Sequence, residues 1–147
     1  MNNTTHHEET TTTTTTTTTP TTREVTMALD TALLTNQLDE ARRYAHDDVV
    51  LHVPGTHPLA GEHHGPEALV RFVEASRERT ESGEHIEVLD VLEGADHAAA
   101  YLHVTAERAG KAPLDNTTVH LLRLVDGRVA EVWLHNWDSH TVNEFWS

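Results

Sequence analysis

Histidine and acidic side chains dominate the residues of this sequence that could do chemistry. Of the 13 His residues, His6 and His7 stand near the N-terminus, and the other eleven lie between His46 and His140. An imidazole titrates close to neutral pH, so it suits both proton transfer and metal binding. The sequence has no Cys, which excludes a disulfide, a thiol nucleophile and a Cys-based zinc site.

Metal and cofactor motifs are the next class to consider. Zinc ligands on a helix follow an i,i+4 spacing, and neither H-x-x-x-H nor H-E-x-x-H occurs here. Convergence of His52, His103, His120 and His135 from neighbouring strands stays open as an alternative. The sequence also lacks a Gly-rich phosphate loop, a G-x-S-x-G elbow and a dinucleotide fingerprint. We therefore expect no metal and no cofactor.

The end of the last predicted strand, residues 129–137, carries the two leading candidates for acid–base catalysis. His135 shares a face with Trp133 by strict alternation, whereas Asp138 has the other parity unless a bulge intervenes. The two residues are therefore rivals for one pocket. In an apolar pocket a carboxyl has its pKa raised toward neutrality and can exchange protons. The alternatives are a turn-capping Asp138 and a half-buried His135 among aromatic side chains.

His120 is the third catalytic candidate. It lies in the predicted strand 117–125 on the same parity as Leu122, which points it inward, although a His satisfied within the core is the alternative. In the preceding strand, the hydroxyl of Tyr101 is able to donate a hydrogen bond to a substrate oxygen. The predicted substrate-binding residues are His57, Tyr101, His103, His52 and Trp133.

The elements that must position these residues follow from the apolar spacing. Helices are expected at about 25–35, at 38–45 and from Pro66 onward, and residues 54–65 read as a loop rich in Pro and Gly. Strands are expected at 49–53, 86–92, 97–108, 117–125 and 129–137, with a last short segment at 141–146. Helices ahead of a run of strands indicate an α+β domain with the helices packed on one face of an antiparallel sheet.

Three segments resemble the SnoaL-like branch of the nuclear transport factor 2-like superfamily. They are Val50–Gly55 with His57–Gly61 and Gly65, the hairpin from Val119 to Trp133 around Asp126-Gly127, and the ending from Asp138 through Phe145-Trp146. The resemblance covers about residues 25–147. It implies an α+β fold in which a curved antiparallel sheet wraps around N-terminal helices and forms a cone with a pocket. Limonene-type epoxide hydrolases and SnoaL-like cyclases of this superfamily carry an acid in the neighbourhood of Asp138.

The resemblance also implies a function. It indicates a cofactor-independent acid–base enzyme on a hydrophobic, carbonyl-bearing small molecule, of the polyketide cyclase or isomerase type of secondary metabolism. One alternative is a non-catalytic small-molecule-binding or assembly module of the same fold, and another is an epoxide hydrolase or dehydratase. Because open sheets of this superfamily usually pair face to face, it also implies a homodimer.

Charge and composition limit the partners. The net charge is −14, with 10 Lys+Arg against 24 Asp+Glu, so a nucleic-acid or membrane-surface partner is not expected. No apolar run approaches the length of a membrane span, and no signal peptide is recognisable, so we expect a cytoplasmic protein. The Thr-rich residues 1–24 have little to bury and are expected to form a disordered tail ahead of the domain.

Overall fold

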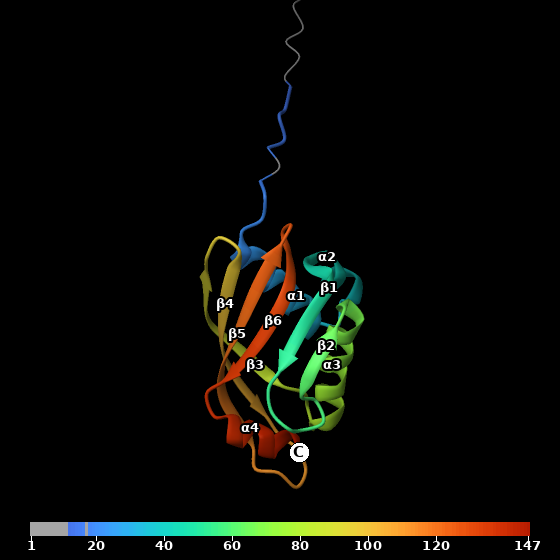
Figure 1. Cartoon of the computed structure of the whole chain (residues 1–147), viewed down its shortest axis with the longest axis vertical. Helices are drawn as coiled ribbons and strands as arrows, with labels where there is room; N and C mark the ends of the chain where they lie inside the picture. Colours follow the sequence, from blue (N-terminus) through green and yellow to red (C-terminus); the bar gives the residue numbers. More distant parts are fainter. Residues whose placement is uncertain (1–11, 17) are drawn as a thin grey trace, which may run out of the picture.

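The computed structural model describes residues 12–16 and 18–147 of the chain (Figure 1). The predicted tail therefore lies partly outside the described residues, at 1–11 and 17. The elements are α1 (Thr22–Leu34), α2 (Leu38–Tyr44), β1 (Ala45–Val53), β2 (Gly61–His64), α3 (Pro66–Arg79), β3 (His85–Glu93), β4 (His97–Ala106), β5 (Leu114–Val125), β6 (Arg128–Asn136) and α4 (Ser139–Trp146). None of the helices in the described part is long and apolar enough to cross a membrane.

Helix α1 begins three residues before the expected domain boundary at residue 25, because Thr21 caps it. The Thr21 hydroxyl accepts the backbone N–H of Glu24 at 3.1 Å, and the Glu24 carboxylate accepts the Thr21 N–H at 3.1 Å. This capping box satisfies two of the backbone donors that a helix start leaves free. The Arg23 N–H also donates to the Glu93 carboxylate at 3.0 Å, which ties the start of α1 to the end of β3.

The six strands form one sheet in the order β2-β1-β6-β5-β4-β3. Strands β1 and β6 run parallel, with Leu51 opposite Val132, and the other neighbours are antiparallel. Strand β2 lies within the segment 54–65 that the sequence predicts as loop, and this prediction is wrong there. The strand is short, polar and paired only with β1, so it lacks the β-branched alternation that marks a strand in sequence.

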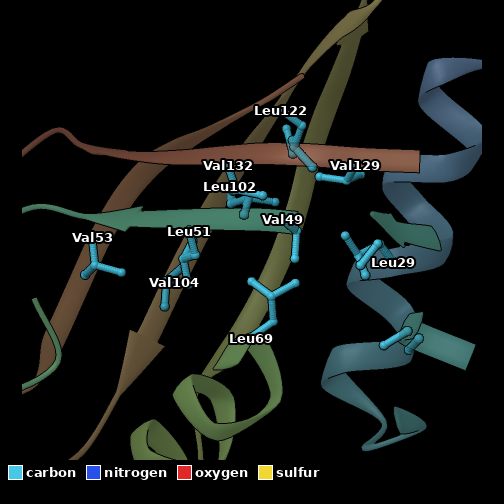
Figure 2. Close-up of a cluster of buried hydrophobic side chains, with 14 of the residues drawn as sticks. Leu29, Val49, Leu51, Val53, Leu69, Leu102, Val104, Leu122, Val129 and Val132 are labelled. Carbon is cyan, nitrogen blue, oxygen red and sulfur yellow. The ribbon is translucent and has the colours of Figure 1, made fainter. Parts of the chain in front are cut away.

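Helices α1 and α3 cover one face of the sheet and enclose the core. Helix α1 packs against β3, β4 and β6, and α3 packs against β1 and β2. Figure 2 shows Leu29 of α1 and Leu69 of α3 directed toward strand residues of this core. Leu29, Leu102 and Leu122 are each at most 2% exposed. The expected α+β fold, with helices on one face of a curved sheet, is confirmed.

The capping box gives a stability prediction for the helix that carries much of the core. Thr21→Ala removes the side-chain acceptor and should lower the free energy of unfolding by about 1 kcal/mol. Thr31→Ala is the matched control, because Thr31 is exposed within the same helix and Ala favours helix. Urea denaturation of both variants measures the difference. Equal stability of the two variants would show that the cap contributes nothing.

Candidate functional site

Two neighbouring cavities lie between the helices and the sheet. The first, which we call the inner cavity, measures about 110 Å³ and is walled mostly by aliphatic side chains of α1, α3 and the sheet. The second, the end cavity, measures about 80 Å³ and reaches Val142 and Trp146 of α4. The two cavities share the side chains of Phe72, Glu84, Ile86, His120 and Leu134 in their walls. They therefore form adjoining parts of one interior space.

Asp30 brings a carboxyl into the wall of the inner cavity. Helix α1 places it there because Leu29 and Leu33, one residue before and three after it, line the same cavity. Burial raises the pKa of Asp30 from 3.8 to about 7. Within the described residues, neither a cation nor a hydrogen-bond donor contacts this carboxyl to oppose the effect. Near neutral pH Asp30 is thus able both to accept and to return a proton.

Glu84 is a second acidic group in the wall that both cavities share. It stands just before β3, and burial raises the pKa of its carboxyl. The Ser76 hydroxyl donates to the Glu84 carboxylate at 3.3 Å, and this bond and the charge of Arg77 act in the opposite direction. The net direction is upward, so Glu84 holds its proton to a higher pH than an exposed glutamate does.

His120 occupies the shared wall from the middle of β5, where it pairs with Ala100 and Leu134 on the flanking strands. Burial lowers its pKa from 6.5 to about 4, and the nearby His135 adds a smaller effect in the same direction. The ring is therefore neutral at physiological pH. In the described part of the chain, no protein group hydrogen-bonds either ring nitrogen, and the side chain lines both cavities. The sequence-based prediction that His120 faces inward agrees with this geometry.

The end cavity has a more polar wall than the inner cavity. The Nδ2 of Asn116 donates to the Oδ1 of Asn136 at 3.0 Å, and the Thr118 hydroxyl donates to the His135 carbonyl at 3.1 Å. Among the described residues, no donor contacts the buried Oδ1 of Asn116, a residue that lines this cavity. An unpaired buried carbonyl is costly in a folded protein.

His57 also lines the end cavity, but both of its ring nitrogens are engaged by the backbone. Its Nδ1 accepts the Leu59 N–H at 3.2 Å, which leaves Nε2 to donate to the Pro54 carbonyl at 3.1 Å. Burial lowers the pKa of this ring, so the neutral form persists. Neither ring nitrogen is therefore free for the predicted substrate contact, and both bonds hold the loop after β1 in place.

That loop is fixed against α4 at the lower end of the molecule in Figure 1. The Thr56 N–H donates to the Asn143 Oδ1 at 2.7 Å. Gly55 has φ +114°, and a Cβ there would stand 2.8 Å from the His57 ring and 2.9 Å from the Asn143 oxygen. Only glycine fits this position without displacing His57. Side chains of the loop and of α4 together line the end cavity.

A wider groove of about 670 Å³ lies outside Glu84, between the end of α3 and the start of β3. It shares Leu34, Val73, Glu84 and Ile86 with the inner cavity, so these side chains form the boundary between solvent and interior. Arg77 crosses this boundary and donates to the carbonyls of Leu33 and Leu34 at the end of α1. The groove and the inner cavity thus lie on opposite sides of the same four side chains.

Asp138 and His135 lie outside both cavities. Asp138 caps α4, since its carboxylate accepts the Thr141 N–H at 3.0 Å and the Thr141 hydroxyl at 2.8 Å. These bonds hold the pKa of Asp138 below its usual value, so the exposed carboxylate stays ionised. His135 is exposed on the opposite face of the sheet from the helices. The geometry therefore supports the capping alternative for Asp138 and does not support catalysis by either residue.

The predicted binding residues His52, Tyr101, His103 and Trp133 also point away from the cavities. His52 stacks on Trp133 at 5.3 Å between ring centroids and contacts Glu131 at 3.1 Å. Their strand positions alternate with buried residues, so all four lie on the outer face of the sheet. The predictions that they contact a substrate in the pocket are corrected accordingly.

The four histidines that could bind a metal together lie on different faces of the sheet. His103 hydrogen-bonds Asp115 at 2.7 Å, and this bond raises the pKa of its imidazole. His52, His103 and His135 stand on the outer face, whereas His120 faces the cavities. Across residues 12–16 and 18–147, no three His, Asp or Glu side chains gather as a metal site. The four histidines therefore do not converge.

Sequence reasoning missed Asp30 and Glu84, although both leave a signal. Asp30 interrupts the apolar stripe that Leu29 and Leu33 define on α1. Glu84 has the same strand parity as Ile86, which points inward. A single acidic residue on an otherwise apolar face is the sequence pattern that indicates both as candidate site residues.

Comparison with known proteins agrees with this fold. Residues 25–132 match the SnoaL-like domain, and the chain belongs to that family. No functionally curated protein matches the sequence. A cystatin-like protein of unknown function from Xanthomonas campestris is 26% identical, with a TM-score of 0.77 over 87% of this chain and 99% of that one.

Two further solved structures show the same fold at lower identity. A nuclear transport factor 2-like protein from Burkholderia xenovorans is 14% identical, with a TM-score of 0.70 over 86% of this chain and 95% of that one. A putative polyketide cyclase from Sinorhizobium meliloti is 20% identical, with a TM-score of 0.61 over 76% of this chain and 93% of that one. The resemblance to the SnoaL-like and nuclear transport factor 2-like proteins is thus confirmed.

The raised pKa of Asp30 predicts a pH-dependent stability difference. The folded state holds the Asp30 proton up to about pH 7 while the unfolded chain releases it near 3.8, so the stability that this group contributes falls as pH rises between these values. Asp30→Asn carries no such proton. We expect the variant to be more stable than wild type by up to about 4 kcal/mol at pH 8 and equally stable at pH 4.

Urea denaturation at pH 4, 6 and 8 measures this difference. Asp39→Asn is the control, because the Asp39 side chain is fully exposed on α2. If Asp30→Asn gave the same stability difference at all three pH values, the carboxyl would have an ordinary pKa.

Proposed function

We propose that the protein is a cofactor-independent acid–base enzyme acting on a small hydrophobic molecule that bears a carbonyl group. The observation that carries this proposal is the carboxyl of Asp30 in an apolar cavity, with no partner among the described residues and with its pKa raised to about 7. Asp30 replaces Asp138 and His135 as the proton-transfer group. The fold likeness to a putative polyketide cyclase supports the same class of chemistry.

The reaction follows from the charge states of the cavity groups. Ionised Asp30 takes a proton from the carbon next to the substrate carbonyl, and the C–H electron pair forms an enolate. Neutral His120 donates an N–H to the enolate oxygen from the wall that the two cavities share. The enolate then regains a proton at another carbon, which is isomerisation, or attacks a second carbonyl of the same molecule, which is aldol cyclisation.

Proton abstraction is testable before the natural substrate is known. In D₂O the wild-type protein should accelerate exchange of the α-protons of cyclohexanone, followed by NMR as loss of the α-proton signal. Asp30→Asn should reduce the protein-dependent rate at least about a hundredfold, the usual size for a lost general base. The rate should rise with pH and level off above about 7, since the ionised carboxylate is the base.

Asp138→Asn and His135→Ala are the controls in this experiment. Asn is able to cap α4 as well as Asp does, and His135 is exposed, so both variants should keep the wild-type rate. A wild-type protein that binds cyclohexanone without accelerating exchange would favour the passive binding module. Loss of the rate in Asp138→Asn with an active Asp30→Asn would return the catalytic role to the last strand.

We also propose that the outer face of the sheet pairs with a second copy of the chain. The helices lie on the other face, and the outer face exposes apolar side chains such as Leu92, 62% exposed, and Tyr101, 41% exposed. Leu121 stands near the middle of this face, between Ala99 and Trp133 on the flanking strands. Exposed apolar side chains rimmed by polar ones, here His103 and His135 of the same face, are typical of an interaction site.

Light scattering at micromolar concentration should therefore give the mass of a dimer. Leu121→Glu places a charge at the centre of the proposed interface and should give a monomer. Trp137→Glu is the control, because Trp137 is 89% exposed beyond the end of β6, and it should remain a dimer. A wild-type monomer, or a Leu121→Glu dimer, would contradict the proposed interface.

A further inference from the structure

The inner cavity combines an aliphatic wall with acidic groups. Leu51, Leu69 and Leu102, which Figure 2 shows in the core, belong to this wall. Of the described side chains that line the cavity, two are acidic, Asp30 and Glu84, and none is Lys or Arg. The whole chain carries a net charge of −14, so the field of the protein also attracts cations. A cation that enters the cavity therefore meets acidic groups and no positively charged one.

The carboxyl of Asp30 has no partner and stays open to an occupant. Among the described residues, no donor contacts either of its oxygens. In the same residues, the buried polar atoms that lack a partner and that water does not reach are the Thr26 hydroxyl and the Oδ1 of Asn116. The oxygens of Asp30 are not among them, so they keep accessible surface. Because Asp30 lines the inner cavity, an occupant of that cavity reaches these oxygens.

The charged groups closest to this wall already have partners. Arg77 donates to the last carbonyls of α1 and lines the outer groove rather than the inner cavity. The Glu84 carboxylate accepts the Ser76 hydroxyl at 3.3 Å, and the charge of Arg77 acts to lower its pKa. Asp30 has no such compensation, and burial raises its pKa. Ionised Asp30 is thus the group that gains most from a cation supplied by a ligand.

The wall and the volume of the cavity limit the kind of cation. A divalent metal ion needs several ligands, and no three His, Asp or Glu side chains gather in the part of the chain that the structure describes. An alkylammonium ion needs a carboxylate for its charge and an aliphatic surface for its body. A cavity of about 150 Å³ accepts benzene, so the inner cavity of about 110 Å³ suits a branched amine of about four carbons.

We infer that the inner cavity is a binding site for a small alkylammonium ion, whose nitrogen pairs with ionised Asp30 and whose alkyl body lies against the aliphatic wall. Folding has already removed Asp30 from water, so only the ammonium group loses hydration on binding. The N–H···O bonds are charge-assisted and form in surroundings of low polarity, where they are strong. This binding needs no turnover and is independent of the proposed function. The bound ion occupies the proposed base and therefore inhibits proton abstraction.

Two probes of nearly equal shape test the preference for a cation. tert-Butylammonium and tert-butanol differ at one polar group, and at pH 8 the amine is protonated while Asp30 is ionised. By NMR titration, the full chain should bind tert-butylammonium at least about tenfold more tightly at this pH. At pH 5 Asp30 is protonated, so the amine should bind no more tightly than the alcohol.

Three variants assign the preference to one carboxylate. Asp30→Asn keeps the size of the side chain and removes its charge, so at pH 8 it should bind the amine no more tightly than the alcohol. Asp39→Asn is the matched control, because it removes the same charge from an exposed position on α2, and it should keep the preference. Glu84→Gln should keep it as well, since Glu84 is not the anchor. A preference lost in Glu84→Gln and kept in Asp30→Asn would contradict the assignment.

The ¹³C resonance of the Asp30 carboxyl covers the case in which Asp30→Asn disturbs the cavity. In wild type, saturating tert-butylammonium should lower the pKa that this resonance reports by at least about one pH unit, the equivalent of a tenfold preference for the ionised form. tert-Butanol should not lower it. Equal affinities of the two probes for wild type at pH 8, or an unchanged Asp30 titration with bound amine, would each overturn the inference.

The outcomes for this site and for the proposed function are distinguishable. Preference for the amine in a wild-type protein that does not exchange the α-protons of cyclohexanone would contradict the proposed function and leave the ammonium site intact. Exchange by a wild-type protein that binds the two probes equally would do the reverse. Where both hold, tert-butylammonium should inhibit the exchange, and tert-butanol at the same concentration should inhibit it less.

Discussion

Desolvation beneath α1 is the constraint on which the chemistry of this protein depends. The same apolar surroundings act on two groups of opposite charge type, and they favour the uncharged form of each. Burial raises the pKa of Asp30 to about 7 and lowers that of His120 to about 4. A cavity open to bulk water would return both groups to their ordinary values, and neither would then differ from the many exposed acids and histidines of the chain.

The desolvation depends in turn on how α1 is held against the sheet. Thr21 caps the first turn of α1, and a hydrogen bond from the Arg23 N–H joins this turn to Glu93 on β3. At the other end, the carbonyls of Leu33 and Leu34 accept hydrogen bonds from the guanidinium of Arg77 on α3. Both ends of α1 are thus fixed by polar groups, and the middle turns bring Leu29 and Asp30 to a cavity with mostly apolar walls. Hydrogen bonds at the edge of the domain keep water away from its interior.

The sequence predicts the fold well and the site in part, for reasons that individual residues make clear. Alternation in β5 correctly places His120 inward, because β5 is paired on both sides and its pairing is regular around His120. Alternation alone does not say which face of β4 or β6 is covered by helices, so the sequence predicts Tyr101 and His135 in the pocket although they lie outside it. The sequence does not single out Asp30, because the apolar stripe around it predicts a helix that packs on the core. One polar residue within such a stripe does not change that prediction. The pairing of β2 with β1 is a tertiary interaction that its four residues do not encode.

The parallel pairing of β1 with β6 has a consequence for how the chain reaches this fold. Strand β1 ends at Val53, and β6 begins at Arg128, so most of the domain is synthesised between the two partners. Until β6 leaves the ribosome, one edge of β1 has no partner and the cavity lacks part of its wall. Contacts between such distant segments close slowly, since the loop entropy must be lost before the pairing is gained. The last strand to be made is therefore the one that completes the sheet, and nascent chains that stop before Arg128 retain an unpaired apolar β1 edge that is prone to aggregation.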